Sequence, residues 1–317
     1  MANPDYTKLL HFDNIGDTLL ISETENNLKH FFEYGMLEVY GWNDVTYDFT
    51  DTPGARLDVL KPVVDENYDD GQVWMAPRKD FVYEQGLDTT SQPIVIDEVL
   101  VNGSTITTGF NIDYPGGRVI FDSPVSTTST VQLEYSYRFV QIKVAENVPW
   151  WRELQFGSFD ATNVHWSQLS DPYEGDWAIG HQHRTQMPLI IVEGTTSGAA
   201  RPYEVGNNSM IIRQDITYSV FAESRKDRNN LLDACRYQND RSIWMFDSQE
   251  LIRDEIYPLD GNGFLLNDTT YPDWVDGGTN SRRWRRLRWT NTSIDQFMLI
   301  HPDLWTGRVK TTCEIII

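Results

Sequence analysis

The 317-residue sequence contains only two cysteines, Cys235 and Cys313, which lie far apart and have no metal-ligand spacing around them. This pattern disfavours a disulfide framework and predicts two buried thiols. No apolar run approaches the roughly 20 residues that a membrane-spanning helix needs, and the first residues lack the basic and apolar segments of an export signal. We therefore expect a soluble protein that is made in the cytoplasm.

Positive charge is also scarce, because 26 Lys and Arg stand against 47 Asp and Glu and give a formal charge of −21. Such a field opposes condensation on nucleic acid or anionic lipid. The sequence has no G-x-S-x-G elbow, no phosphate-binding G-x-x-x-x-G-K-[ST] loop and no G-x-G-x-x-G after a strand. In so acidic a chain, neighbouring carboxylates such as Asp69 and Asp70 are expected by chance. We therefore predict a protein that is not an enzyme and holds no cofactor.

Aromatic residues are abundant, with 11 Trp, 15 Tyr and 14 Phe, and they favour packed β-structure and partner surfaces. The length predicts two or three compact regions. The fold class we expect is α+β and rich in β-strand. Changes in composition divide the chain into a helical segment (residues 1–45), a β-rich domain (46–146), a loop-rich connector (147–185) and an α+β domain (186–317).

The helical segment carries a candidate capping box, in which Ser22 caps a helix and Glu25 returns to the cap amide. Gly35 or Gly41 is expected to end this helix. Its apolar face consists of residues three or four positions apart, namely Leu28, Phe31, Phe32 and Met36.

The β-rich domain shows short apolar runs separated by turn residues. Asn102 and Gly103 tolerate positive φ and predict a tight turn. In residues 116–144, two alternating runs flank a Ser- and Thr-rich stretch, which predicts a hairpin of two long strands. The expected strands are residues 94–101, 110–114, 118–122 and 131–144.

The connector contains scattered tryptophans, and we expect it to be a long crossover that these rings anchor to the body or to a partner. The region after it predicts the order strand, strand, helix, strand. Ser224 is the expected N-cap of that helix, and Leu231, Leu232 and Cys235 its buried stripe. Three further strands are expected near residues 283–290, 297–301 and 309–317.

Two stretches resemble metal sites, but each lacks part of the required set of ligands. Asp65, Asn67 and Asp69 alternate as calcium ligands do, but the twelfth position is alanine, so a solvated acidic turn is preferred. His181 and His183 place two imidazoles near each other, yet no third ligand is identifiable. We therefore predict no metal site.

The most unusual polar feature is a run that reverses the charge of the chain. Its members, which we call the arginine run, are Arg282, Arg283, Trp284, Arg285, Arg286, Arg288 and Trp289. In a strand these arginines are split between both faces. Arg and Trp are enriched at interface hot spots, and guanidinium groups bind carboxylates bidentately. We expect an interface with a neighbouring copy; nucleic-acid contact and salt bridges within the chain are the alternatives.

Several segments resemble virion structural proteins of tailed bacteriophages. In the first 145 residues they are the predicted hairpin and residues 69–74, 78–84 and 135–139. The second half is similar in its order of elements to proteins that terminate phage tails, through residues 200–206, the strand at 220–222 with its following helix, and residues 310–315. The long N-terminal β domain departs from that family.

The resemblance implies a structural subunit of the virion, made in the host cytoplasm, at the neck or tail terminus. Its partners would be other copies in a ring, neighbouring neck and tail proteins, and DNA that passes without sequence-specific binding, with no membrane involved. A host-recognition, baseplate or fibre β-module that binds glycans is the alternative. A cell-wall-degrading enzyme is the third possibility.

Overall fold

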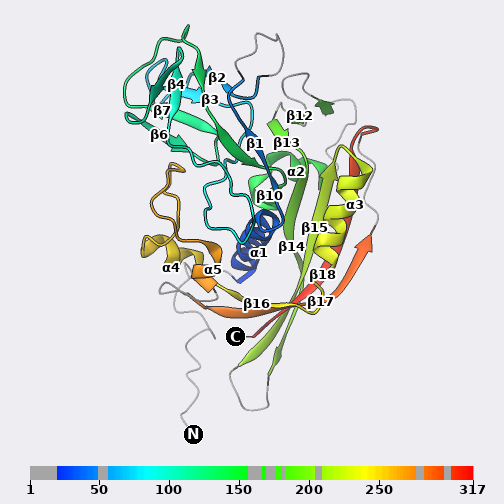
Figure 1. Cartoon of the computed structure of the whole chain (residues 1–317). Helices are drawn as coiled ribbons and strands as arrows, with labels where there is room; N and C mark the ends of the chain where they lie inside the picture. Colours follow the sequence, from blue (N-terminus) through cyan, green and yellow to red (C-terminus); the bar gives the residue numbers. More distant parts are fainter. Residues whose placement is uncertain are drawn as a thin grey trace.

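The computed structural model describes residues 20–48, 56–155, 166–168, 176–179, 183–203, 209–275, 282–295 and 301–316. The class is α+β and rich in β-strand, as predicted. One group of short strands lies at the top of the molecule, and a sheet of long strands runs down its other side (Figure 1). The first helix lies between these two parts (Figure 1).

The upper part is a seven-stranded sheet in the order β5-β4-β8-β2-β3-β7-β6. Asn102 and Gly103 both adopt left-handed conformations, with φ of 51° and 77°, and join β4 to β5. The predicted tight turn is therefore confirmed. The strands are β2 (Val59–Pro62), β3 (Val73–Met75), β4 (Val99–Val101), β5 (Ser104–Ile106), β6 (Phe110–Asp113), β7 (Arg118–Phe121) and β8 (Val131–Gln132).

The predicted long hairpin over residues 116–144 is wrong. Its first strand, β7, pairs with β3 and β6, and its second is divided into β8, β9 (Tyr135–Arg138) and β10 (Gln141–Val144). Each piece enters a different sheet: β9 pairs with β1 (Trp42–Val45), and β10 joins the sheet of long strands. The alternation misled because polar residues such as Ser136 and Arg138 are buried as well, so β9 does not have one buried face and one solvent face.

The sheet of long strands has the order β10-β14-β15-β18-β17-β16. All its neighbouring strands are antiparallel except β10 and β14, which are parallel. A parallel pair requires a crossover connection, and residues 145–188 supply it. The other strands are β14 (Leu189–Pro202), β15 (Met210–Ala222), β16 (Ser242–Met245), β17 (Arg285–Asp295) and β18 (Trp305–Ile316).

The crossover is anchored by aromatic residues, as predicted. Trp150, Trp151 and Trp177 are buried with Leu189 and Phe221 of the long strands. The described parts of the crossover are a 3-10 turn (Ala145–Asn147), α2 (Pro149–Gln155), β11 (Trp166–Gln168), β12 (Asp176–Ile179) and β13 (His183–Gln186).

Two helices, α1 (Leu20–Leu37) and α3 (Arg225–Arg236), cover the same face of the long sheet. A Cβ added at Gly307 would lie 2.7 Å from Leu232 of α3, and one at Gly194 would lie 3.1 Å from Ile21 of α1. Both glycines therefore allow a helix to approach the backbone of the sheet.

The predicted start of α1 is wrong, because Leu20 and Ile21 are already helical and Ser22 is an internal residue. Of the two predicted stops, Gly35 lies inside the helix, while the Gly41 amide bonds to the Met36 carbonyl at 2.8 Å just after its end. The expected apolar face is confirmed: Leu28, Phe31 and Phe32 are buried, and Met36 packs against the same core.

The cap of α3 is confirmed, since Ser224 Oγ accepts the Asp227 amide at 3.0 Å. Its predicted stripe of Leu231, Leu232 and Cys235 is buried. Two short helices, α4 (Ser248–Arg253) and α5 (Tyr271–Val275), pack around Phe246 and Trp274. No helix among the described ranges is long and apolar enough to cross a bilayer. The strand expected at residues 297–301 lies almost wholly outside those ranges.

Two buried polar groups, one on α1 and one at β9, interact electrostatically. Arg138 donates to the Glu84 carboxylate, and both side chains are at least nine-tenths buried. His30 Nδ1 lies 3.1 Å from Glu33, and Lys29 lies 3.4 Å from the other oxygen of that carboxylate. Burial alone would raise the pKa of Glu33, but Lys29 and the hydrogen bond from His30 hold it well below its usual value. Glu33 of α1 and Arg138 of β9 carry opposite charges that attract each other, and this attraction favours the packing of the helix beside the strand.

Candidate assembly interface

The arginine run enters the long sheet as the start of β17. Leu287 and Trp289 are fully buried on the face that α1 and α3 cover, whereas Arg286 and Arg288 are exposed on the opposite face. The Trp289 indole donates to the Tyr218 hydroxyl at 3.0 Å and so has an internal role. Arg285 lies two residues before Leu287 in the strand and is therefore on the same face as Leu287. The predicted split of the arginines between two faces is confirmed.

Some of these arginines bind groups of their own chain. Arg282 lies 3.4 Å from Asp254, and Arg288 lies 3.1 Å from Asp240. Arg283 donates to the Val275 carbonyl at 2.8 Å. The pair of Arg288 and Asp240 is mostly exposed, so it contributes little to stability. Intramolecular contacts therefore account for part of the run.

Arg285 and Arg286 differ from the others, since within the described ranges no carboxylate lies within 4.0 Å of either guanidinium. Each stacks on a ring instead: Arg285 lies 5.1 Å from the centre of Trp284, and Arg286 lies 5.9 Å from that of Trp244. Burial lowers the pKa of Arg285, and its Nε is buried with no hydrogen-bond acceptor among the described atoms. The rings hold these two cations in place, and no carboxylate partner lies beside them in the part of the chain that the structure describes.

On the face of the long sheet opposite α1 and α3, the crossover covers one end, and charged side chains lie toward the β14–β15 tip. Arg213 binds Glu314 at 2.7 Å, and Lys310 lies 3.1 Å from Asp295. Toward this tip, the side chains on this face of β15, β17 and β18 are mostly polar, and they alternate along each strand with side chains that are buried on the other face. We call this part the open face and define it by Arg201, Arg213, Arg286, Arg288, Lys310, Thr312 and Glu314.

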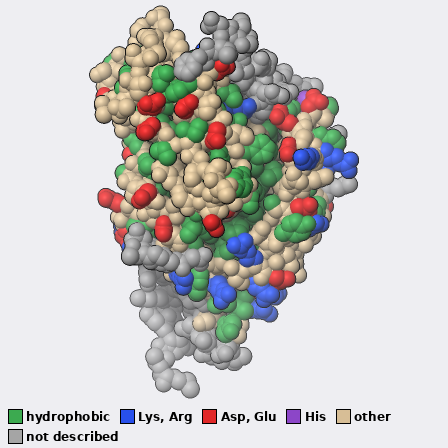
Figure 2. All heavy atoms as spheres, in the orientation of Figure 1, with side chains coloured by type: hydrophobic (Ala, Val, Ile, Leu, Met, Phe, Trp, Pro, Cys, Tyr) green, Lys and Arg blue, Asp and Glu red, His purple; other side chains and the backbone are tan. Residues whose placement is uncertain are grey.

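Charge is unevenly distributed over the molecule. Lys and Arg side chains gather over β16 and β17, while Asp and Glu are spread over the upper part (Figure 2). Residues 56–146 contain 14 Asp and Glu against seven Lys and Arg. The upper part is thus acidic, as the whole chain is, and the Lys and Arg side chains over β16 and β17 form a basic surface in this view.

The cations outside the run were not predicted from the sequence. Arg213 and Lys310 come from β15 and β18, and the register places both on the open face. A signal was present in residues 308–315, where Arg308, Lys310, Thr312 and Glu314 alternate with mostly apolar residues. Such alternation is typical of a strand with one covered face.

The two incomplete metal motifs have different outcomes. Asp65 accepts the amide of Asn67 at 3.0 Å and pairs with Arg118 at 3.0 Å, so its carboxylate stabilises a turn. The hydrogen bond to the Asn67 amide lowers the pKa of Asp65. His181 lies outside the described residues, and His183 is described only as the start of β13. Across the described ranges no group of three His, Cys, Asp or Glu side chains is placed to hold a metal ion.

Comparisons extend neither the fold nor the site to other proteins. No protein family, no curated protein and no solved structure matches the chain.

Proposed function

We propose that this chain is a structural subunit of a tailed-phage virion that assembles into a ring at the neck or tail terminus, around the passage for DNA. It acts by binding and without catalysis. The observation that supports this proposal is the pair Arg285 and Arg286, which stack on tryptophans and have no carboxylate within 4.0 Å in the described chain. Arg286 lies on the open face, and the half-buried Arg285 lies on the other side of the same strand.

A second copy is the occupant that this surface fits best. Every copy carries an acidic upper part and a net charge of −21, so it supplies carboxylates that guanidinium groups bind strongly. The same charge repels phosphate, which disfavours DNA as the ligand of these arginines. A basic surface on one end and an acidic surface elsewhere make a heterologous contact, and repetition of such a contact closes a ring when the rotation permits.

Charge reversal tests the proposal. In the variant Arg285→Glu/Arg286→Glu we expect the ring of the unmodified chain to dissociate to monomers at low ionic strength, as measured by light scattering and electron microscopy. The matched control is Arg236→Glu, which reverses one exposed charge on α3. A compensating Glu→Lys or Asp→Lys change on the facing surface should restore the ring. A chain that stays monomeric at every concentration, or a variant that assembles normally, would contradict the proposal.

A glycan-binding module is the second candidate, favoured by a cavity of about 260 Å³ beside the cis peptide Met187–Pro188. Tyr137 and the half-exposed Phe139 line it together with Asn43 and Asp227. Aromatic rings beside amide and carboxylate groups suit sugar rings and their hydroxyls. Binding on a glycan array that is lost in Phe139→Ala would favour this function over assembly.

A further inference from the structure

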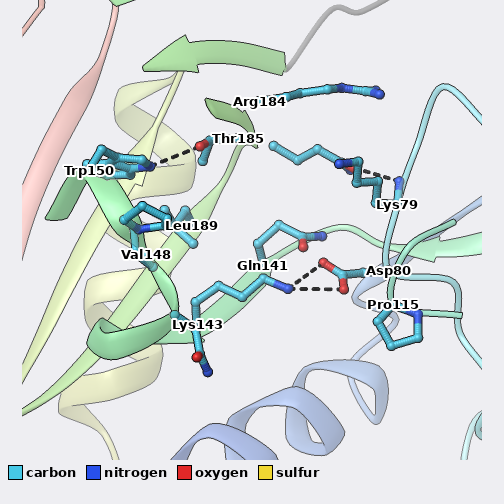
Figure 3. A pocket seen from close by; sticks show the side chains of 13 residues that line it. Lys79, Asp80, Pro115, Gln141, Lys143, Val148, Trp150, Arg184, Thr185 and Leu189 are labelled. Atoms are coloured by element: carbon cyan, nitrogen blue, oxygen red, sulfur yellow. Dashed lines mark hydrogen bonds and ion pairs between the residues drawn. The ribbon is translucent and has the colours of Figure 1, made fainter. Parts of the chain in front are cut away.

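A second cavity, of about 410 Å³, lies where the upper sheet, the crossover and the long sheet meet. Figure 3 shows Asp80 and Pro115 on one side of it and Val148 and Leu189 on the other. The Gln141 side chain lies between these two sides (Figure 3). The cavity is therefore bounded by segments that are far apart in the sequence.

Two buried glutamines line this cavity, Gln141 on β10 and Gln186 on β13. Their exposed fractions are only 4% and 7%. The backbone amide of Gln141 donates to the Pro188 carbonyl at 2.9 Å, and Pro188 lies two residues after Gln186. The two side chains therefore come from adjacent backbone segments.

Backbone partners fix the orientation of both side-chain amides. The Lys79 backbone amide donates to the Gln186 side chain at 2.6 Å, and an N–H can donate only to the amide oxygen. The Gln141 side chain donates to the Arg138 carbonyl at 3.2 Å, and a carbonyl can accept only from the amide nitrogen. Within the described ranges, Gln186 Nε2 has no acceptor and Gln141 Oε1 has no donor. The lining therefore offers one donor and one acceptor that are fixed in advance, and such groups lose little entropy when a ligand binds.

The rest of the lining suits an uncharged ligand with an apolar part. Lys143 Nζ lies 2.9 and 3.1 Å from the two Asp80 oxygens, so this ion pair closes on itself (Figure 3). The wall on the other side is apolar and consists of Val148, Pro149 and Leu189.

We infer that this cavity binds a small uncharged molecule with a carboxamide group, whose oxygen accepts from Gln186 Nε2 and whose NH₂ donates to Gln141 Oε1. Its apolar part lies against Val148 and Leu189. A carboxamide carries an acceptor and a donor side by side, as these two glutamines require. A carboxylate has only acceptors and an ammonium group only donors, so each would leave one glutamine amide buried without a partner. The volume suits one small molecule, and this inference is independent of the proposed assembly.

Benzamide, acetophenone and benzoate have nearly the same shape and differ in their hydrogen-bonding groups. By calorimetry with the full chain, we expect one benzamide per chain with a dissociation constant on the order of 1 mM. Acetophenone, in which a methyl group replaces the NH₂, and benzoate should each bind at least about tenfold more weakly. Equal binding of benzamide and acetophenone, or no saturable benzamide binding, would overturn the inference.

The variant Gln186→Glu tests the same site from the side of the protein. It keeps an oxygen for the Lys79 amide and replaces the Nε2 donor by a second acceptor. Benzamide should bind this variant at least about tenfold more weakly, and benzamidinium, which is planar and has only donors, should bind it more tightly than benzamide does. Gln249→Glu, at an exposed position of α4, changes the net charge equally and should leave both affinities as they are in the unmodified chain.

Thermal unfolding shows whether Gln186→Glu is folded. Unchanged benzamide affinity in the folded variant would refute the site. If the variant does not fold, the comparison of benzamide with acetophenone on the unmodified chain decides between the two outcomes.

Discussion

Replacement of Arg138 by methionine should strongly destabilise the protein. Its guanidinium is buried, donates to Glu84 and lies 5.6 Å from the centre of the Tyr83 ring. Although burial alone would lower the pKa of Arg138, Glu84 and then Glu33 raise it further, so the cation persists in the folded state. In Arg138→Met the Glu84 carboxylate stays buried without its cation. Loss of one member of a buried pair costs about 3–5 kcal/mol, and we expect a loss of that size.

The assay is urea unfolding at pH 7, followed by tryptophan fluorescence, with the variant Arg138→Met/Glu84→Gln as partner. The glutamine keeps an acceptor for the Tyr83 amide, which lies 3.3 Å from the Glu84 carboxylate. The double variant should regain at least half of the lost free energy of unfolding, because no unpaired charge remains. Arg236→Met, at an exposed pair, should cost no more than about 1 kcal/mol. The reasoning fails if the single variant loses less than about 1 kcal/mol, or if the double variant is no more stable than the single.

Three other outcomes follow from buried groups. Trp289→Phe removes the hydrogen bond to Tyr218 and should cost about 1–2 kcal/mol in urea unfolding, and an unchanged midpoint would contradict this. Burial and, next, the charge of Lys29 lower the pKa of His30 below 6.5, although Glu33 opposes this shift. The stability that the folded state gains from a neutral His30 is therefore complete above pH 6.5 and is lost as the pH falls. The free energy of unfolding should therefore drop between pH 7 and pH 5, and drop less in His30→Asn. Burial raises the pKa of Cys235 to about 12, so the folded chain should not react with a thiol reagent at pH 8 while the unfolded chain does; rapid labelling of the native protein would show an accessible thiol.

Local chemistry made part of the fold predictable. The turn at Asn102 and Gly103 and the cap at Ser224 each depend on one residue type with a specific backbone preference, and both are present. The apolar face of α1 was predictable because spacings of three and four residues have one structural meaning. The capping box at Ser22 matched its motif, yet the helix begins earlier, at Leu20.

Long-range pairing was not predictable in the same way. The alternation in residues 131–144 is real, but it carries no information about which strand lies alongside, and the chain enters three sheets there. The burial of Arg138 depends on Glu84 and Glu33, which are distant in sequence. In the arginine run, the spacing predicted that the side chains are split between two faces, whereas the pairs with Asp240 and Asp254 depended on the tertiary fold.

The position of α1 in the chain has a consequence for synthesis. Its apolar face packs against residues of β10, β14 and β15 and against Trp289, and all of these are made much later than the helix. At ordinary rates of roughly 5–20 residues per second, about 10–40 s separate the appearance of the helix from that of β15. During this interval Phe31 and Phe32 lack their partners Trp289 and Tyr218. The growing chain therefore exposes an amphipathic helix on the ribosome that β10 contacts first and that the long strands of the C-terminal half finish burying.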